Sequence, residues 1–231
     1  MRRATSGAGS FDDRERRMHS GATWNMRRGA LAGVVQRDFV TVVSGLPRSG
    51  TSMLMRMLEA GGIPALTDGL RAADADNPHG YFELESVKQL PADTAWIEAA
   101  QGKAVKIVSA LVDKLPAGYQ YRVVFVERDL GEVLASQRRM LDSRGQPTDR
   151  VSDAAMAAMF HRHVAAVLER VQERPATRLM RIGHAEVLAC PAGAARRLDD
   201  FLAGGLDRDA MAAAVDPSLW RQRGSAPAHG R

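Results

Sequence analysis

The chain has 231 residues, of which 45% are hydrophobic and 26% are charged, as in a globular protein with a single main core. Its one cysteine, Cys190, excludes an intrachain disulfide, and we expect a packed small residue in a cytoplasmic protein. No apolar run is long enough to span a membrane, and no apolar stretch of a secretory signal follows Arg2 and Arg3. The net charge is +5, but the basic residues are not interleaved with aromatic ones and no motif that reads a nucleic-acid groove is present. The sequence therefore does not favour a nucleic-acid partner.

Composition divides the chain into three parts. Residues 1–37 are rich in Gly, Ser and Arg and lack a sustained period, which predicts a disordered basic segment. Residues 38–217 alternate apolar runs with helical patterns, which predicts one domain. Residues 218–231 predict a polar C-terminal tail.

Strand and helix patterns alternate along the predicted domain. Apolar runs predict strands at residues 38–44, 104–109, 121–127 and 177–182. Helical periodicity and capping residues predict helices at about residues 51–60, 84–100, 129–141, 152–173, 191–203 and 207–214, and Pro91 is a candidate break within 84–100. Strands joined through helices form right-handed crossovers, so we predict an α/β fold, a P-loop-type parallel sheet with helices on both faces.

The most informative stretch is residues 42–52, Val-Val-Ser-Gly-Leu-Pro-Arg-Ser-Gly-Thr-Ser, between the first predicted strand and the first predicted helix. Gly45, Gly50, Thr51 and Ser52 have the spacing of a P-loop. In such a turn, successive backbone N–H groups converge on an anion, and the helix N-terminus adds further donors and its positive dipole end. The sequence therefore predicts an anion-binding loop rather than an incidental Gly/Ser-rich turn.

The loop departs from that of the nucleotide triphosphatases at one position. Those enzymes have Lys where this chain has Thr51, and the basic residue here is Arg48, inside the loop. The planar guanidinium of Arg48 matches a tetrahedral oxyanion, and Thr51 and Ser52 add hydroxyl donors. The departure argues against an ordinary ATP or GTP enzyme, although the anion cradle is kept.

A second candidate anion site follows the third predicted strand. Arg128 lies at the carboxyl end of that strand, where open α/β sheets bind ligands, and Ser136 lies about two helical turns further on. These two side chains could contact one phosphate group. Alternatively, Arg128 pairs with a local carboxylate such as Glu127 or Glu132, and Ser136 has no role.

Together these two sites resemble those of the sulfotransferases that use 3′-phosphoadenosine 5′-phosphosulfate (PAPS), over roughly residues 38–205 in element order. The chain is most similar to small bacterial members of that family. The resemblance implies PAPS as co-substrate, no metal, and transfer of the sulfuryl group to a hydroxyl or amine of a small-molecule or glycan acceptor. It also implies that the loop holds the 5′ end of the donor through Arg48, Ser49, Gly50, Thr51 and Ser52. Arg128 and Ser136 would hold its 3′-phosphate.

The same resemblance implies a catalytic group of Arg48, Glu83 and Lys106. Arg48 would offset the charge that develops on the bridging oxygen during an in-line displacement. Lys106 matches a Lys at the end of the second strand in many cytosolic members. A His follows that Lys in those members, whereas Ile-Val-Ser stands at 107–109 here, so the general base must come from elsewhere.

Glu83 is the candidate base, since other branches of the family use a Glu. It lies in a turn rich in Pro and Gly, where shielding by Tyr81 and Phe82 would make its carboxylate a better base. Alternatively, Glu83 only places negative charge at the start of the next helix. Asp68 could orient an acceptor, but an Asx turn is the preferred interpretation, and His79 is a reserve base that could equally be a surface residue.

The other histidines and the C-terminal basic residues give weaker signals. His161 and His163 lie two positions apart on a predicted helix and so point to different faces, and without a third ligand they do not predict a metal site. We expect His184, just after the fourth predicted strand, to pack under the sheet edge. Residues 220–223, Trp-Arg-Gln-Arg, could fold back onto a nucleotide phosphate or form a solvated tail after an anchored Trp.

Two other functions stay open from the residues alone. An atypical P-loop kinase or nucleotide hydrolase would need a Lys for the phosphates and an acidic Mg²⁺ ligand at a strand end. The loop has no Lys, and only Glu127 and Asp129 are candidates for the acid. A non-catalytic nucleotide-binding module would keep the donor fold without the base. Binding of adenosine 3′,5′-bisphosphate without turnover of any acceptor would favour the module.

Overall fold

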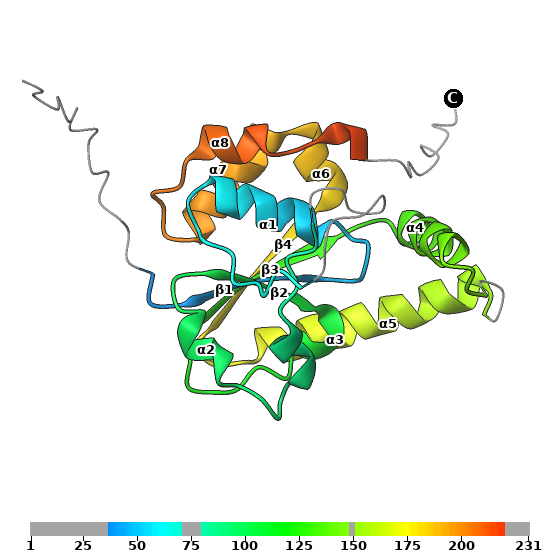
Figure 1. Cartoon of the computed structure of the whole chain (residues 1–231), viewed down its shortest axis with the longest axis horizontal. Helices are drawn as coiled ribbons and strands as arrows, with labels where there is room; N and C mark the ends of the chain where they lie inside the picture. The colour runs from blue at the N-terminus through cyan, green and yellow to red at the C-terminus, as the bar shows by residue number, and fades with distance from the viewer. Residues whose placement is uncertain (1–36, 71–79, 148–150, 220–231) are drawn as a thin grey trace, which may run out of the picture. The chain divides into compact units, whose positions relative to one another are not determined.

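Four parallel strands form the centre of the domain in a computed structural model that describes residues 37–70, 80–147 and 151–219 (Figure 1). In sheet order the strands are β2 (Ala104–Val108), β1 (Val40–Gly45), β3 (Tyr121–Glu127) and β4 (Thr177–Gly183). Val42 of the central strand β1 pairs with Val105 on one side and with Val123 on the other. Because every pair is parallel, the strands end at one common edge of the sheet, which confirms the predicted α/β fold.

Helices cover both faces of the sheet, as predicted (Figure 1). One face carries α1 (Thr51–Ala60), α6 (His184–Ala189), α7 (Pro191–Phe201) and α8 (Arg208–Ala213). The opposite face carries α2 (Trp96–Ala99), α3 (Ser109–Val112) and α5 (Asp153–Gln172). The described elements also include α4 (Leu130–Ser143), which follows β3 and contacts α5, and two 3₁₀ helices, η1 (Glu85–Gln89) and η2 (Pro217–Leu219).

Two hydrophobic cores hold the sheet between these helices. Successive residues of a strand point to opposite faces, so neighbouring valines of β1 enter different cores. Val43 is buried with residues of α1 and α7, whereas Val42 is buried with residues of β2 and α5. Burial on both faces accounts for the nearly continuous burial of β1 and β3, whereas the edge strand β4 is mostly half-buried or exposed. The carboxyl edge of the sheet is therefore a rigid support for the loops that leave it.

The four predicted strands are present, within two residues of the predicted ends. The helical stretch predicted at 84–100 is interrupted at its candidate break, Pro91. Residues there form η1 and α2 on either side of Pro91, because proline lacks an N–H donor and disfavours helix at the residue before it. Helices α3 and α6 were not predicted, since each is too short for a period of 3.6 residues to show.

Some expectations concern single residues or the chain ends. Cys190 is exposed where α6 meets α7, so the expectation that it is packed is wrong. The predicted disordered segment and polar tail fall almost wholly outside the described residues, as do His79 and residues 220–223, and they stay predictions. Within the residues that the structure describes, no helix combines the length and the apolar character needed to cross a membrane.

Candidate nucleotide and acceptor site

The predicted anion-binding loop joins β1 to α1 at the carboxyl edge of the sheet. Gly50 is the N-cap of α1, with a φ of 105° that disfavours any residue with a side chain. A Cβ atom on Gly50 would lie 2.6 Å from Cδ2 of His184, and one on Gly45 would lie 2.8 Å from the carbonyl oxygen of Val126. Glycine is therefore needed at both positions because the loop lies directly against β3 and α6.

Arg48 links the loop to the second predicted anion site. Its Nε donates a hydrogen bond to the hydroxyl of Ser136 on α4 at 2.9 Å. Arg128 in turn donates from its guanidinium to the backbone carbonyl of Arg48 at 3.1 Å. Arg48 has a left-handed φ of 71°, an unfavourable conformation for a residue with a side chain, and these contacts help to hold it. The two sites that were predicted separately are thus one connected cluster.

Arg128 and Glu132 form an ion pair at the start of α4. Nε of Arg128 lies 2.8 Å from Oε2 of Glu132, and the two side chains are only 9% and 8% exposed. The alternative that Arg128 pairs with a local carboxylate is therefore correct for Glu132. The other half of that alternative is wrong, because Ser136 is not idle but accepts the hydrogen bond from Arg48. Both charges of the pair are compensated inside the protein, as burial requires.

His184 packs against the loop rather than simply under the sheet edge. It is the first residue of α6, is 7% exposed, and has its ring against the position of Gly50. Burial is the main cause that lowers the pKa of His184 to about 4, and the positive charge of Arg128 lowers it further. The negative charge of Glu132 has the opposite, smaller effect. The imidazole is therefore neutral at pH 7. Its place directly after β4, at the carboxyl edge, is the signal that could have predicted a position in the site.

Glu83 and Lys106 lie together over the face of the sheet that α1 covers. Nζ of Lys106 donates to the carbonyl oxygen of Tyr81 at 2.6 Å and lies 3.9 Å from Oε1 of Glu83. Lys106 is the middle residue of β2 and the register partner of Val43, so it does not stand at the end of the second strand as the resemblance implies. The backbone carbonyl of Glu83 also accepts a hydrogen bond from the hydroxyl of Thr67 at 2.7 Å. The structure thus brings two of the predicted catalytic residues into contact.

Asp68 forms the predicted Asx turn. Its Oδ1 accepts from the backbone N–H of Leu70 at 3.0 Å, and its Oδ2 accepts from that of Glu85 at 2.6 Å. These backbone hydrogen bonds lower the pKa of Asp68. Both carboxylate oxygens are engaged by the backbone, which supports a structural role in holding this loop against η1.

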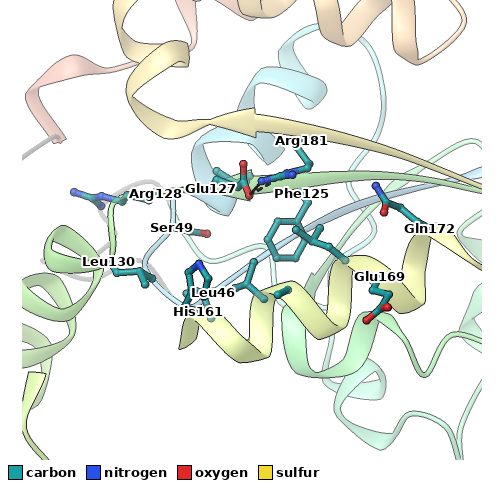
Figure 2. Close-up of a pocket in the computed structure, with 14 residues that line it drawn as sticks. Leu46, Ser49, Phe125, Glu127, Arg128, Leu130, His161, Glu169, Gln172 and Arg181 are labelled. Carbon is teal, nitrogen blue, oxygen red and sulfur yellow. Dashed lines mark hydrogen bonds and ion pairs between the residues drawn. The ribbon is translucent and has the colours of Figure 1, made fainter. Parts of the chain in front are cut away.

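The two histidines of α5 point to different faces, as predicted. Nε2 of His163 is hydrogen-bonded to the hydroxyl of Ser109 at 2.9 Å, at the start of α3. His161 instead lines a cavity of about 380 Å³ between α5 and the carboxyl ends of β3 and β4 (Figure 2). The described residues contain no group of three or more side chains that could hold a metal ion.

The cavity begins at the anion-binding loop. Leu46 and Ser49 line one end, and Phe125 contributes apolar surface (Figure 2). Leu168 of α5 adds further apolar surface to the lining. Ser49 is 1% exposed, and its hydroxyl has no hydrogen-bond partner among the residues that the structure describes. An unsatisfied buried hydroxyl is uncommon and marks this end of the cavity as a candidate ligand contact.

Comparison with solved structures identifies the fold. A sulfotransferase domain from the olefin synthase of Synechococcus PCC 7002 superposes with a TM-score of 0.50 at 16% sequence identity, over 84% of this chain and 90% of that domain. The chain has a sulfotransferase-like fold. A sulfotransferase from Alicyclobacillus acidocaldarius (TM-score 0.47, 15% identity, 78% of this chain and 87% of that one) superposes less well. So does a mouse sulfotransferase solved with PAP (TM-score 0.45, 16% identity, 77% and 63%). No protein-family model and no curated protein matches the sequence.

Proposed function

We propose that the protein transfers a sulfuryl group from PAPS to a hydroxyl or amine of an acceptor in the cytoplasm. The observation that carries this proposal is the connected cluster of Arg48, Ser136 and Arg128 at the carboxyl edge of the sheet. A nucleotide with anionic groups at both its 5′ and 3′ positions would contact the loop and the second site together. The sulfotransferase-like fold supports the same donor.

The donor would be held by the groups that the sequence predicts. The loop N–H groups of residues 48–52, with the hydroxyls of Ser49, Thr51 and Ser52, would bind the 5′-phosphosulfate. Arg128 and Ser136 would bind the 3′-phosphate. ATP lacks a 3′-phosphate, so this second contact would select PAPS. The neutral imidazole of His184 next to Gly50 would place a compact polar group beside the donor without adding charge.

The chemistry would be a single in-line displacement. The acceptor oxygen or nitrogen forms a bond to sulfur while the bond from sulfur to the 5′-phosphate oxygen breaks, which releases adenosine 3′,5′-bisphosphate (PAP). The acceptor proton passes to the Glu83 carboxylate, and Lys106, 3.9 Å from that carboxylate, would orient it. Arg48 would offset the charge that develops on the leaving oxygen. We include no metal, because the donor arrives already activated.

A calorimetric titration tests the donor assignment directly. We expect PAP to bind without magnesium, and to bind more tightly than 5′-AMP or Mg-ATP. Ser136→Ala should weaken PAP about tenfold, the effect of one charge-assisted hydrogen bond, and should leave 5′-AMP within about twofold. Preference for Mg-ATP would favour an atypical kinase or nucleotide hydrolase. Tight PAP binding with no turnover of any acceptor would favour a non-catalytic module.

A further inference from the structure

We propose that the acceptor binds at the corner formed by the end of β2 and the turn around Glu83, and that it is a hydroxyl compound with an apolar body rather than a sugar. This inference rests on the proposed sulfuryl transfer, since it names the class of acceptor for that reaction. Among the residues that the structure describes, the large hydrophobic side chains that are exposed are Leu70, Val108, Val151 and Met159. Two of them, Leu70 and Val108, belong to this corner.

Val108 lies between the candidate base and the donor loop. It is the last residue of β2, and its register partner on β1 is Gly45, where the anion-binding loop begins. Alternate residues of a strand point to the same face, so Val108 shares the face of Lys106 and lies about 6.6 Å further along the strand. Lys106 in turn lies 3.9 Å from the carboxylate of Glu83. An acceptor whose hydroxyl reaches both Glu83 and the 5′ end of the donor therefore lies against Val108.

Leu70 is held near Glu83 by a set of short hydrogen bonds. The hydroxyl of Thr67 and the backbone N–H of Asp68 both donate to the carbonyl oxygen of Glu83, at 2.7 and 3.2 Å. The carboxylate of Asp68 accepts from the backbone N–H of Leu70 at 3.0 Å and from that of Glu85 at 2.6 Å. The backbone of Leu70 is therefore fixed although 77% of the residue is exposed. A ligand that covered its side chain would gain binding free energy from the burial.

The turn that carries Glu83 is held in an unfavourable backbone conformation. Phe82 has a left-handed φ of 53°. The carbonyl oxygen of Tyr81 before it accepts from Nζ of Lys106 at 2.6 Å, and that of Glu83 after it accepts from Thr67. The half-buried ring of Phe82 packs against the core under α1. Strain that the surrounding contacts maintain is typical of functional sites, and here it fixes the base next to apolar side chains.

The polar side chains of this corner already have partners inside the protein. Lys106 is paired with the carboxylate of Glu83, Thr67 donates to the backbone of Glu83, and both carboxylate oxygens of Asp68 accept from backbone N–H groups. A sugar would lose water from several hydroxyl groups here without gaining equivalent hydrogen bonds, which is unfavourable. An apolar body needs no such partners, so the corner favours it.

Binding of 2-naphthol to the full chain loaded with PAP tests the class of acceptor without any need for turnover. This probe has one hydroxyl on an apolar double ring, and its own fluorescence reports binding. The competitor is N-acetylglucosamine, a compound of similar size with several hydroxyl groups. We expect 2-naphthol to bind, and a hundredfold excess of N-acetylglucosamine to leave it bound. Equal affinities for the two compounds would overturn the proposal, and so would competition between 2-naphthol and PAP.

Two variants test the side chains that the proposal names. Val108→Thr keeps the shape of the side chain but replaces a methyl group with a hydroxyl, and it should weaken 2-naphthol about threefold. Leu70→Asn should weaken it about fivefold. Val151→Thr is the matched control, because Val151 is 43% exposed against 40% for Val108 but precedes α5, and it should keep the wild-type affinity. Equal effects of Val108→Thr and Val151→Thr, or no effect of either corner variant, would contradict the assignment.

A further variant tests the location. Ala165 lines the cavity on the opposite face of the sheet, between α5 and the ends of β3 and β4, and it is exposed on α5. Ala165→Phe should fill part of that cavity and leave the affinity for 2-naphthol within about twofold of wild type. If it abolished 2-naphthol binding while PAP still bound, the apolar body would lie in the cavity and the corner would not be the acceptor site.

The two proposals fail in different ways. If PAP does not bind but 2-naphthol binds the free chain and depends on Val108 and Leu70, the donor assignment is wrong and the apolar site stands. If PAP binds selectively but 2-naphthol does not bind, or binds independently of these two residues, the donor assignment stands and the acceptor site is wrong.

Discussion

The buried imidazole of His184 makes the stability of the protein depend on pH in a defined window. The folded chain takes up a proton at His184 only near its lowered pKa of about 4, whereas the unfolded chain does so near the ordinary value of 6.5. The stabilising effect is therefore complete above pH 6.5 and is lost as the pH falls from 6.5 toward 4. Between pH 7.5 and pH 4.5 this difference amounts to about 2.5 kcal/mol of unfolding free energy.

Urea unfolding of the wild type and of His184→Gln at both pH values measures this effect. Carboxylates also titrate in this range, but their contribution cancels when the two proteins are compared at each pH. We expect the difference in unfolding free energy between wild type and His184→Gln to fall by about 2.5 kcal/mol from pH 7.5 to pH 4.5. His161→Gln, at an exposed site on α5, controls for the loss of a histidine as such. A difference that does not change with pH would refute the desolvation argument.

Three further variants address the loop and the base. Arg48→Lys keeps the charge but loses the planar fork that reaches Ser136, so we expect PAPS-dependent turnover to fall about 100-fold in a steady-state assay. Glu83→Gln should lower turnover by about 10²-fold or more, because the amide cannot take the acceptor proton, while calorimetry should show PAP affinity within about twofold of wild type. Gly50→Ala should cost about 2–4 kcal/mol in urea unfolding, because it adds a contact with His184 to the strain at a φ of 105°.

Each of these variants has its own control or contrary result. Turnover preserved in Arg48→Lys would mean that charge alone, and not the guanidinium geometry, serves the reaction. An active Glu83→Gln would move the base role elsewhere, and His161 at the loop end of the cavity would then be the next variant to measure. Gly62→Ala has a similar φ of 99° with nothing within 4 Å, so it measures backbone strain alone. A cost in Gly50→Ala no larger than in Gly62→Ala would contradict the close contact with His184.

Local patterns predicted those parts of the structure that depend on neighbouring residues. The apolar runs gave the parallel sheet, and the Gly spacing gave the loop between β1 and α1. Pro91 likewise indicated the break within 84–100, although the pattern did not show how short η1 and α2 are. The residues that indicate each of these elements lie within about one helix length of one another in the sequence.

Contacts between distant elements could not be predicted in the same way. Nothing near Arg48 in the sequence indicates that its guanidinium reaches Ser136, and nothing near His184 indicates Gly50. These contacts depend on where α4 and α6 lie relative to the carboxyl ends of the strands. That arrangement is set by the packing of the whole domain. The contact of Lys106 with the turn around Tyr81 has the same origin.

The position of Arg128 implies that the two anion sites are thermodynamically coupled. Arg128 would bind the 3′-phosphate, but it also donates to the carbonyl oxygen of Arg48 and so supports the loop that would bind the 5′ end. Arg128→Ala alone would leave the carboxylate of Glu132 buried without its partner, at a cost of about 3–5 kcal/mol in stability. The double variant Arg128→Gln/Glu132→Gln removes both charges together and avoids that loss.

We expect this double variant to weaken PAP by about 100-fold and also to weaken 5′-AMP, by about three- to tenfold, in the calorimetric titration. Ser136→Ala should weaken PAP alone, because the hydrogen bond that Ser136 accepts comes from the side chain of Arg48 and not from the loop backbone. If the double variant bound 5′-AMP as well as the wild type does, the contact from Arg128 to the Arg48 carbonyl would not support the loop. The two sites would then bind their phosphates independently, and the left-handed conformation of Arg48 would need another cause.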